Sequence, residues 1–445
     1  MRFIFLKKVR SIFSCMLIFI LLLSACSSYS RGGNVVTRND VLSIRNGKYY
    51  LDGKPFSEIS FNKFDLFWSI WDEAYAGRPI GRDNPKVAAQ AEALKELHDL
   101  GFRTIRFFAL PFMHADWRKI YEDPDKRESV FYKAMDLVLD LCDENGIKVV
   151  YSLACGAFID RIWSSEKASY LYGEEHTREL VGNPNSKSRQ RLYAYLEDIV
   201  NRYKERKTIL MWEISNELTN SADIGSPGDD IYQGQRMPGM AQLAAFFNDT
   251  AKKIKSIDPL RLVNNGGSHL REHAWNLYLT RKWVLDTPDE QFKVYKMLYE
   301  GSQLDVIDIH YYNIAAGGYY VAGPNGTDSV IDLEKHMEFS LQLGKPLYIG
   351  EYGPLPLLRD HKIWQTFPDY FESYQDEAAV KWFQKALDEL IEAGVPLTHW
   401  WCYQSDRNQD QNKKDRMDLD IQRDPELLRM IADANQKLKQ KLGTR

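Results

Sequence analysis

The chain has 445 residues, enough for one large domain or two to three of average size. With 44% apolar and 27% charged residues, it has the composition of an ordinary soluble globular protein, so a large buried core is available. The formal net charge of −4 gives no electrostatic footprint for nucleic acid, and we expect no nucleic-acid partner.

The first 25 residues have the pattern of an export signal, because a basic segment precedes a short apolar stretch and then small residues. The ending Leu23-Ser24-Ala25-Cys26 looks like the lipobox of bacterial lipoproteins, in which the cysteine is lipidated and begins the mature chain. The rival interpretation is an uncleaved membrane anchor, but the apolar stretch is short for a spanning helix of ~20 residues. We therefore expect a signal peptide over residues 1–25 and a protein anchored to the bacterial cell envelope, at the outer membrane or the cell surface, through lipid on Cys26.

A Ser/Gly-rich tether over residues 26–40 comes next and should be flexible. The stretch "VLSIRNGKYYLDGKPF" then places two β-patterned runs around Asn46-Gly47, which predicts an N-terminal β-hairpin. From there strand-like and helix-like segments alternate for eight rounds with no clear linker. We expect residues 41–445 to form a single domain and to act as a monomer.

In each of the eight rounds, a predicted strand is followed by a predicted helix. The strands are 57–62, 103–110, 148–154, 209–215, 261–264, 305–310, 346–350 and 396–402. The helices that follow them are 86–100, 129–145, 188–205, 239–257, 289–300, 330–343, 375–393 and 424–442. Three of the helix ends, in "ELHDLGF", "DENGIK" and "EAGVP", close on a glycine just before a strand, as a helix C-cap does.

Strands that alternate with helices predict an α/β fold with a parallel sheet, and eight repeats indicate closure into a (β/α)8 TIM barrel. The alternative is an open doubly wound sheet, which would require a Gly-rich phosphate turn after the first strand, and "SFNKFDLFW" has none. The strand-to-helix connections are the long ones, and in a barrel these gather on the C-terminal face, where active sites lie. These loops carry four tryptophans, for which the alternatives are sugar stacking and ordinary packing: Trp163, Trp275, Trp283 and Trp364.

Two of the predicted strands end on a carboxylate. "MWEISNELTN" brings Glu217 just past the fourth strand, and "KPLYIGEYGP" brings Glu351 to the end of the seventh. A buried strand seldom ends on an acid without a reason, because burying a charge is costly unless it is paired. Strands four and seven lie on opposite sides of a barrel's mouth, so the two side chains should converge above it. Two facing carboxylates suit retaining glycoside hydrolysis, in which they lie ~5–5.5 Å apart.

Further strand-end residues are expected to complete this site: Arg106, Asn216, His310, Tyr312, and Trp400 or Trp401. Arg106 on the second strand is placed to keep the nucleophile ionised, although a structural ion pair is the alternative. His310 is either part of the site or a satisfied core histidine. Glu213 lies four residues before Glu217, so in an extended strand both side chains point to the same side. Glu213 is therefore expected in the barrel interior, below the rim.

At this point the chain resembles glycoside hydrolase family 5, the cellulase and β-mannanase family. This family belongs to a larger clan of enzymes that carry the acid/base after strand four and the nucleophile after strand seven. The matching elements occur in order over residues 41–442: Arg106, Asn216-Glu217, His310-x-Tyr312, Glu351, and Trp400 or Trp401. The resemblance implies a retaining β-glycoside hydrolase that needs no cofactor, with Glu217 as acid/base and Glu351 as nucleophile. For Glu217 taken alone, a helix N-cap or a salt-bridge residue is the alternative.

The substrate expectation rests on one mismatch and one match. Classical cellulases of the family carry a histidine at the end of strand three, where this chain reads "YSLACGAF", with Ser152 or Cys155 as its replacement. "WEISNE" is similar to the W-E-x-x-N-E run of mannanases. The resemblance thus implies an endo-β-1,4-mannanase-like or β-glucanase-like activity on a β-linked carbohydrate. The alternatives are an exo-acting β-mannosidase or β-glucosidase of the same family, or a catalytically silent glycan-binding lipoprotein; transglycosylation also stays open.

Two stretches raise the question of a metal. "HLREH", residues 269–273, fits the H-x-x-E-H zinc pattern, which requires a helix that carries both histidines on one face. It follows "NNGGS" in a predicted loop, so sugar-contacting or surface histidines are the better interpretation. Residues 404–420 are acid-rich but lack the glycine and the spacing of a calcium loop. We expect no metal, and buried free thiols rather than a disulfide framework.

Overall fold

The computed structural model describes residues 36–111, 117–154, 178–219, 239–280, 282, 284–312, 320–322, 328–330, 332–353, 377–403 and 424–444. The expected signal peptide, Cys26 and almost all of the tether lie outside these residues, so export and lipidation stay predictions. Other residues named in the sequence analysis also lie outside the described ranges: Cys155, Trp163, Trp283, Trp364 and residues 404–420. Within the described ranges, no helix combines the length and the apolar character that crossing a bilayer requires. The fold below is that of the compact unit Thr37–Arg445.

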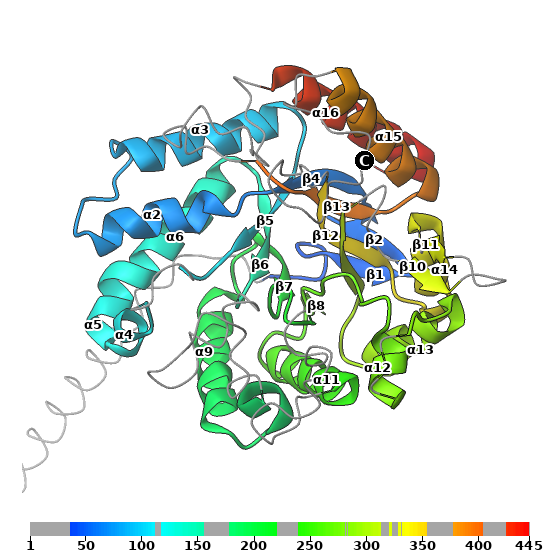
Figure 1. Ribbon diagram of the computed structural model, residues 1–445. Coiled ribbons are helices and arrows are strands. Elements are labelled where there is room, and N and C mark those ends of the chain that lie inside the picture. Colours follow the sequence, from blue (N-terminus) through cyan, green and yellow to red (C-terminus); the bar gives the residue numbers. More distant parts are fainter. Residues whose placement is uncertain are drawn as a thin grey trace, which may run out of the picture. The chain divides into compact units, whose positions relative to one another are not determined.

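Eight strands form one parallel sheet that curves into a barrel, with the helices outside it (Figure 1). In chain order they are β4 Glu58–Asn62, β5 Thr104–Phe108, β6 Lys148–Ser152, β7 Ile209–Glu213, β8 Leu262–Asn264, β9 Ile307–Tyr312, β12 Leu347–Gly353 and β13 Leu397–Trp400. Neighbours in the sheet run β8-β7-β6-β5-β4-β13-β12-β9. At the seam between β8 and β9, the Asp305 N–H donates to the Val263 carbonyl at 2.9 Å, and the Val263 N–H donates to the Asp305 carboxylate at 2.7 Å. The predicted (β/α)8 barrel is confirmed.

The eight predicted helices are present with bounds shifted by only a few residues. They are α3 Pro85–Asp99, α6 Lys133–Glu144, α9 Lys187–Tyr203, α11 Met240–Ile257, α13 Pro288–Tyr299, α14 Leu333–Leu343, α15 Glu377–Ala393 and α16 Pro425–Leu442. The glycines expected to end three of them, Gly101, Gly146 and Gly394, have φ values of +90°, +64° and +71°. A residue without Cβ adopts this left-handed conformation at little cost, so each chain turns directly from helix into strand.

The structure also holds short elements that the sequence did not predict. They are α2 Asp65–Tyr75, α4 Trp117–Glu122, α5 Pro124–Lys126, α12 Ala274–Thr280, the π-helical turns η1 Arg127–Tyr132 and η2 Arg178–Gly182, and a hairpin of β10 Tyr320–Ala322 with β11 Asp328–Val330. Helix α2 buries Phe67, Ile70 and Trp71, which recur at helical spacing. Its N-cap is Phe64, which makes no side-chain capping bond, so the usual polar start signal is missing.

The predicted N-terminal hairpin is confirmed and covers the lower end of the barrel. Strands β1 Ser43–Arg45 and β2 Lys48–Leu51 pair across Asn46 and Gly47, whose φ values of +51° and +70° define the expected tight turn. Strand β3 Lys54–Pro55 adds a third strand. Side chains of this small sheet pack against strand residues at the N-terminal barrel end: Leu42, Tyr49, Leu51 and Phe56 against Val150, Leu210, Tyr348 and Leu397. That end is closed, which leaves the C-terminal end for a site.

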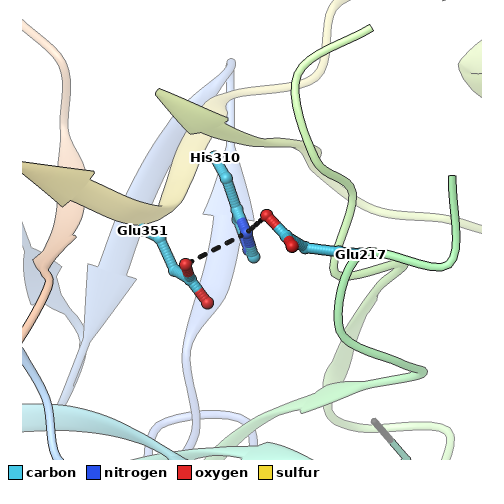
Figure 2. Close-up of side chains that lie close together, drawn as sticks. All are labelled: Glu217, His310 and Glu351. Carbon is cyan, nitrogen blue, oxygen red and sulfur yellow. Dashed lines mark hydrogen bonds and ion pairs between the residues drawn. The ribbon is translucent and has the colours of Figure 1, made fainter. Parts of the chain in front are cut away.

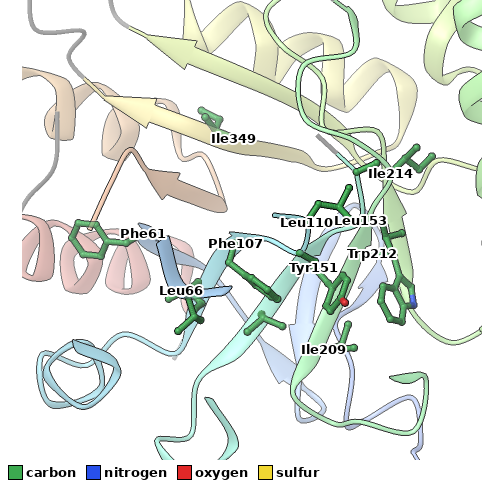
Figure 3. Packing of buried hydrophobic residues seen from close by; sticks show 14 of the residues in the cluster. Phe61, Leu66, Phe107, Leu110, Tyr151, Leu153, Ile209, Trp212, Ile214 and Ile349 are labelled. Carbon is green, nitrogen blue, oxygen red and sulfur yellow. The ribbon is translucent and has the colours of Figure 1, made fainter. Parts of the chain in front are cut away.

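Alternate strand residues point outward to the helices or inward to the barrel axis. Outward side chains such as Phe107, Tyr151, Trp212 and Ile349 pack in the main hydrophobic layer (Figure 3). Full burial of each such side chain contributes roughly 2–3 kcal/mol to folding. Cys142 and Cys402 are buried in the described part of the chain, as expected for core thiols.

The inward positions are polar at several levels of the barrel. Low in it, the Tyr348 hydroxyl lies 3.0 Å from His399 Nδ1, and His399 Nε2 lies 3.2 Å from Thr104 Oγ1. Thr104 in turn donates to the Glu58 carboxylate at 2.6 Å. Burial raises the pKa of Glu58 and lowers the pKa of His399 to about 3. The interior is therefore a hydrogen-bonded polar column and not an apolar core.

Burial of neutral histidines predicts acid destabilisation. Burial lowers the pKa of His310 and His336 to about 4 and that of His399 to about 3. Below an ordinary histidine pKa of about 6.5 the unfolded chain takes up protons that the folded chain does not bind. Stability is therefore full above about pH 6.5 and falls by roughly 1.4 kcal/mol per pH unit for each histidine as the pH drops toward 4.

Urea unfolding at a series of pH values from 7 to 4.5 measures this slope. His336 donates through Nδ1 to the Asp332 carbonyl, and an asparagine amide reproduces that donor. His336→Asn should thus lose one histidine's share of the slope while the rest of the pH dependence persists. A variant whose unfolding free energy keeps the full wild-type slope would contradict the assignment.

Candidate active site

The two carboxylates that the sequence paired lie together at the C-terminal mouth of the barrel (Figure 2). One oxygen of Glu217, one oxygen of Glu351 and one ring nitrogen of His310 all lie within 4.8 Å of one another. Glu351 lies within β12, and Glu217 follows β7. The eightfold barrel thus brings together acids that are 134 residues apart in the chain.

The backbone at Glu217 is held in an unusual conformation. Its φ is +53°, a region that non-glycine residues seldom occupy and that costs on the order of 1–3 kcal/mol. The Glu217 N–H donates to the Gly266 carbonyl at 2.8 Å, and the Asn216 N–H donates to the Ala154 carbonyl at 2.8 Å. These bonds tie the end of β7 to the chain on both neighbouring sides, which fixes the direction of the Glu217 side chain.

Arg106 lies fully buried below the two acids, and all five of its N–H donors have acceptors. Nη1 donates to Glu351 Oε1 at 2.9 Å and to Asn62 Oδ1 at 2.8 Å. Nε and Nη2 donate to the two oxygens of Glu213 at 2.9 and 2.7 Å, and Nη2 donates also to Asn216 Oδ1 at 2.5 Å. A saturated guanidinium of this kind has a single orientation.

This arrangement also fixes the amide of Asn216. Because an arginine N–H needs an acceptor, the Asn216 oxygen must face Arg106 and its NH₂ group must face the other way. A donor is therefore presented beside Glu217 and away from the guanidinium.

His310 lies between the two acids. Its Nδ1 is 2.9 Å from Glu217 Oε1 and 3.5 Å from Glu351 Oε2. Burial lowers the pKa of His310 to about 4, although the neighbouring Glu351 charge opposes this shift. The ring is therefore neutral near neutral pH, and it holds Glu217 by a hydrogen bond and not by a full charge.

The two acids have unequal surroundings. The Glu351 side chain is 6% exposed and lies beside the Arg106 cation, which favours its ionised form. The Glu217 side chain is 28% exposed and lies against a neutral imidazole. Two carboxyls with such different environments are suited to different roles in a reaction.

Of the two tryptophans proposed on strand eight, Trp400 is buried in the core and Trp401 is partly exposed. Trp400 is 1% exposed, and its ring stacks on Phe383 of α15 at 5.1 Å. Because His399 faces the barrel interior, the next residue faces the helices, so the substrate contact expected of Trp400 is corrected to a core role. Trp401 is half-buried and stacks on Phe64 at 5.3 Å.

Other expectations have mixed outcomes. Tyr312 ends β9, but its side chain is outside the described atoms. Glu213 is confirmed in the barrel interior, and Ser152 is buried at the end of β6. Asn62 is a site residue that the sequence reading missed, since it accepts from Arg106 and donates to the Gly350 carbonyl at 2.9 Å. The signal was present, because Asn62 is a polar residue at the end of the first barrel strand.

The zinc interpretation of residues 269–273 fails on its geometry. These residues are not helical, since α12 begins only at Ala274. His269 is buried, with Nδ1 2.9 Å from the Leu270 carbonyl. Among the described residues, the group of metal-ligand type with three members is Glu217, His310 and Glu351, the acid pair itself.

The comparisons with known proteins agree with this geometry. Residues 73–406 match the model of the family "Cellulase (glycosyl hydrolase family 5)". A mannan endo-1,4-beta-mannosidase of Solanum lycopersicum is 21% identical over 332 residues, which cover 70% of this chain and 73% of that protein. A glycoside hydrolase family 5 mannosidase of Rhizomucor miehei superimposes with a TM-score of 0.59 at 15% identity, over 92% of this chain and 100% of that one.

An endo-1,4-beta-mannanase structure, also from Rhizomucor miehei, superimposes with a TM-score of 0.56 at 16% identity. It covers 90% of this chain and 99% of that one. The structural likenesses establish the shared barrel, and the family match extends over most of the chain. This chain belongs to glycosyl hydrolase family 5 and is a glycoside hydrolase.

Proposed function

We propose that this protein hydrolyses the β-1,4 linkages of mannan with retention of configuration, Glu351 acting as nucleophile and Glu217 as acid/base. The observation that carries the proposal is the approach of the two carboxylates, with one oxygen of each within 4.8 Å. An inverting enzyme separates its acids by about 6.5–9.5 Å to leave room for a water molecule. The shorter spacing supports direct attack by one acid.

Glu351 is suited to attack the sugar. Arg106 Nη1 donates to its Oε1 at 2.9 Å, and His310 Nδ1 lies 3.5 Å from its Oε2, in a nearly dry position. Attack on the anomeric carbon forms a glycosyl ester on Glu351 and releases the leaving-group oxygen. A lone pair of the carboxylate forms the new C–O bond while the glycosidic C–O bond breaks, and the departing oxygen takes the proton of Glu217. The guanidinium remains in place for the hydrolysis of the ester.

Glu217 is suited to carry the proton. It is the more exposed acid, so a leaving group and later a water molecule have access to it. It protonates the leaving oxygen in the first step and takes a proton from water in the second. The neutral ring of His310, 2.9 Å away, holds the carboxyl in place in both protonation states, because an imidazole either donates or accepts through Nδ1 according to its tautomer.

The remaining residues suit sugar binding. The NH₂ of Asn216, turned away from Arg106, is directed to donate to the 2-hydroxyl, a contact that strengthens in the transition state. Trp401 is proposed as the stacking floor for the reacting sugar, backed by Phe64. Tyr312 keeps its proposed role beside His310 on β9.

The choice of mannan rests on the relatives and on the sequence. The similar curated proteins are named as mannan endo-1,4-beta-mannosidases, and two of the matched solved structures are a mannosidase and an endo-mannanase. The run "WEISNE" is also of the mannanase type. We propose endo cleavage and not exo cleavage because the similar curated proteins are named as endo-acting enzymes.

Product analysis on a panel of glycans tests this proposal. The protein is incubated with mannan, cellulose, xyloglucan and mixed-linkage glucan, and reducing ends and product lengths are measured. We expect a ladder of manno-oligosaccharides from mannan. Mannose alone would replace endo by exo action, and release of sugar only from a glucan would overturn the substrate.

Variants assign the two acids. Glu351→Ala and Glu217→Ala should each lower kcat on mannan by about 10³-fold or more, as does loss of a covalent-catalysis residue in other hydrolases. With an aryl mannoside whose leaving group needs no proton, azide should restore Glu217→Ala because a small anion reaches the glycosyl-enzyme. Glu300→Ala, at an exposed glutamate, is the control. Wild-type kcat in either active-site variant would contradict the assignment.

The glycine that supports Glu217 gives a further prediction. A Cβ on Gly266 would lie 1.5 Å from the Ser215 carbonyl oxygen, so Gly266→Ala must push the end of β7 away and Glu217 with it. A displacement of about 1 Å costs up to roughly 10²-fold in rate. We expect kcat to fall to that extent, measured on the best substrate of the panel.

Gly301→Ala is the matched control. Gly301 has nearly the same φ as Gly266, +67° against +64°, but a Cβ there meets nothing within 4 Å. The two substitutions therefore share the cost of a positive φ, and only one disturbs the site. Equal kcat values in the two variants would show that Gly266 does not position Glu217.

A further inference from the structure

Glu213 is a buried acid that the proposed reaction does not use. It ends β7, four residues before Glu217, and its side chain is fully buried. Ionised carboxylates are rarely buried unless a cation compensates them. Its compensation is complete, because both oxygens accept from one edge of Arg106, at 2.9 Å from Nε and 2.7 Å from Nη2.

This two-point contact sets the rotation of the guanidinium. With Nε and one Nη2 hydrogen held by Glu213, the remaining three hydrogens have fixed directions, because the group is planar. They go to Glu351, Asn62 and Asn216. The hydrogen bond to the proposed nucleophile and the orientation of the Asn216 amide are therefore consequences of where Glu213 lies.

Glu213 also divides the charge of Arg106. The one cation serves two carboxylates, Glu213 and Glu351, at 2.7 and 2.9 Å. Had Glu213 been neutral, Glu351 would face an undivided positive charge and lose a nearby negative one. Such a carboxylate is held more firmly in its ionised form, and it is a weaker nucleophile, because its electron pairs are more strongly attracted to the cation.

The other titratable groups around this pair come from β9, β12 and β13. On β13, burial together with the Arg106 charge lowers the pKa of His399 to about 3. Burial, together with the Glu213 charge, raises the pKa of Asp308 well above its ordinary value. Burial lowers the pKa of His310 to about 4, and burial with the Glu213 charge raises that of Tyr348. Within this buried layer, Glu213 and Glu351 are the carboxylates that bond directly to the Arg106 guanidinium.

We propose that Glu213 is a positioning residue for the reaction: it orients Arg106 and takes up part of its charge, so that Glu351 is held in place but remains reactive. The inference rests on the proposed role of Glu351 as nucleophile. It assigns to the first glutamate of "WEISNE" a part in catalysis that is exerted through Arg106, without contact with the sugar.

Glu213→Gln tests the charge. The amide keeps the size of the side chain and removes the negative charge. We expect kcat on the best glycan substrate to fall at least about tenfold with KM within about twofold. The acidic limb of the kcat/KM profile should move to lower pH by about one unit, because Glu351 then stays ionised in more acid solution. The shift is the decisive readout, since a general loosening of the barrel does not move a limb in that direction.

Two companion variants isolate the effect. Glu213→Asp keeps the charge and shortens the side chain, so it should lower kcat but leave the acidic limb at the wild-type pH. The double variant Glu213→Gln/Asp308→Asn also removes the acid that could ionise in place of Glu213. The acidic limb of its kcat/KM profile should move to lower pH at least as far as that of Glu213→Gln.

Glu58→Gln is the matched control. Glu58 is another fully buried glutamate of the barrel interior, bonded to Thr104 and the Arg103 N–H and not to Arg106. It should leave the acidic limb unchanged. Thermal unfolding of each variant establishes that it is folded, and Glu213→Asp carries the test if Glu213→Gln does not fold.

The inference is overturned if the acidic limb of the Glu213→Gln profile coincides with that of the wild type. It is also overturned if Glu58→Gln or Glu213→Asp shifts the acidic limb as far as Glu213→Gln does. Its failure is distinct from failure of the proposed function. In the latter case the wild-type protein releases no sugar from any glycan, or Glu351→Ala retains wild-type kcat, before any profile is compared.

Discussion

The saturated guanidinium of Arg106 is the interaction on which the mouth of this barrel depends. Burial of one cation and two carboxylates without water carries a desolvation cost of several kcal/mol per ion, and only close, complete hydrogen bonding offsets it. Each arginine donor has an acceptor within 3 Å: Asn62 of β4, Glu213 of β7, Asn216 just after β7, and Glu351 of β12. Removal of any acceptor leaves a donor of a buried cation unsatisfied.

The same network explains why the proposed catalytic pair is asymmetric. Glu351 shares a cation with Glu213, whereas Glu217 meets a neutral imidazole and is more exposed. A barrel interior that is polar from Glu58 to Arg106 allows such a layer to be built, and the hairpin over residues 43–55 closes its lower end to water. Stability and reactivity therefore draw on the same buried hydrogen bonds.

Much of the fold was predictable because its signals are periodic. Eight alternations of strand and helix, with helix ends on Gly101, Gly146 and Gly394, predicted the barrel and its element order. Helix α2 was missed because it begins directly after a strand with no capping side chain at Phe64. In "THWW" both Thr398 and His399 are polar, so strand parity was ambiguous, and only the inward contact of His399 shows that Trp400 faces the helices.

For the site, the strand ends predicted which residues gather and that the two acids face each other, but they left the hydrogen-bond partners of Arg106 open. Glu217, Glu351, Asn216 and His310 were placed at the mouth from their positions after strands four, six and seven. That Arg106 takes Glu213 as its two-point partner, and that Asn62 joins it, depends on side-chain directions across strands far apart in sequence.

The central claim is that Glu217 and Glu351 are close enough for a covalent intermediate. The configuration of the first sugar released tests it most directly, by ¹H NMR recorded before the product mutarotates. The account predicts that the new reducing end appears first in the β configuration, the same as the bond that was cleaved. Initial appearance of the α anomer would mean a single displacement by water and would contradict Glu351 as the nucleophile.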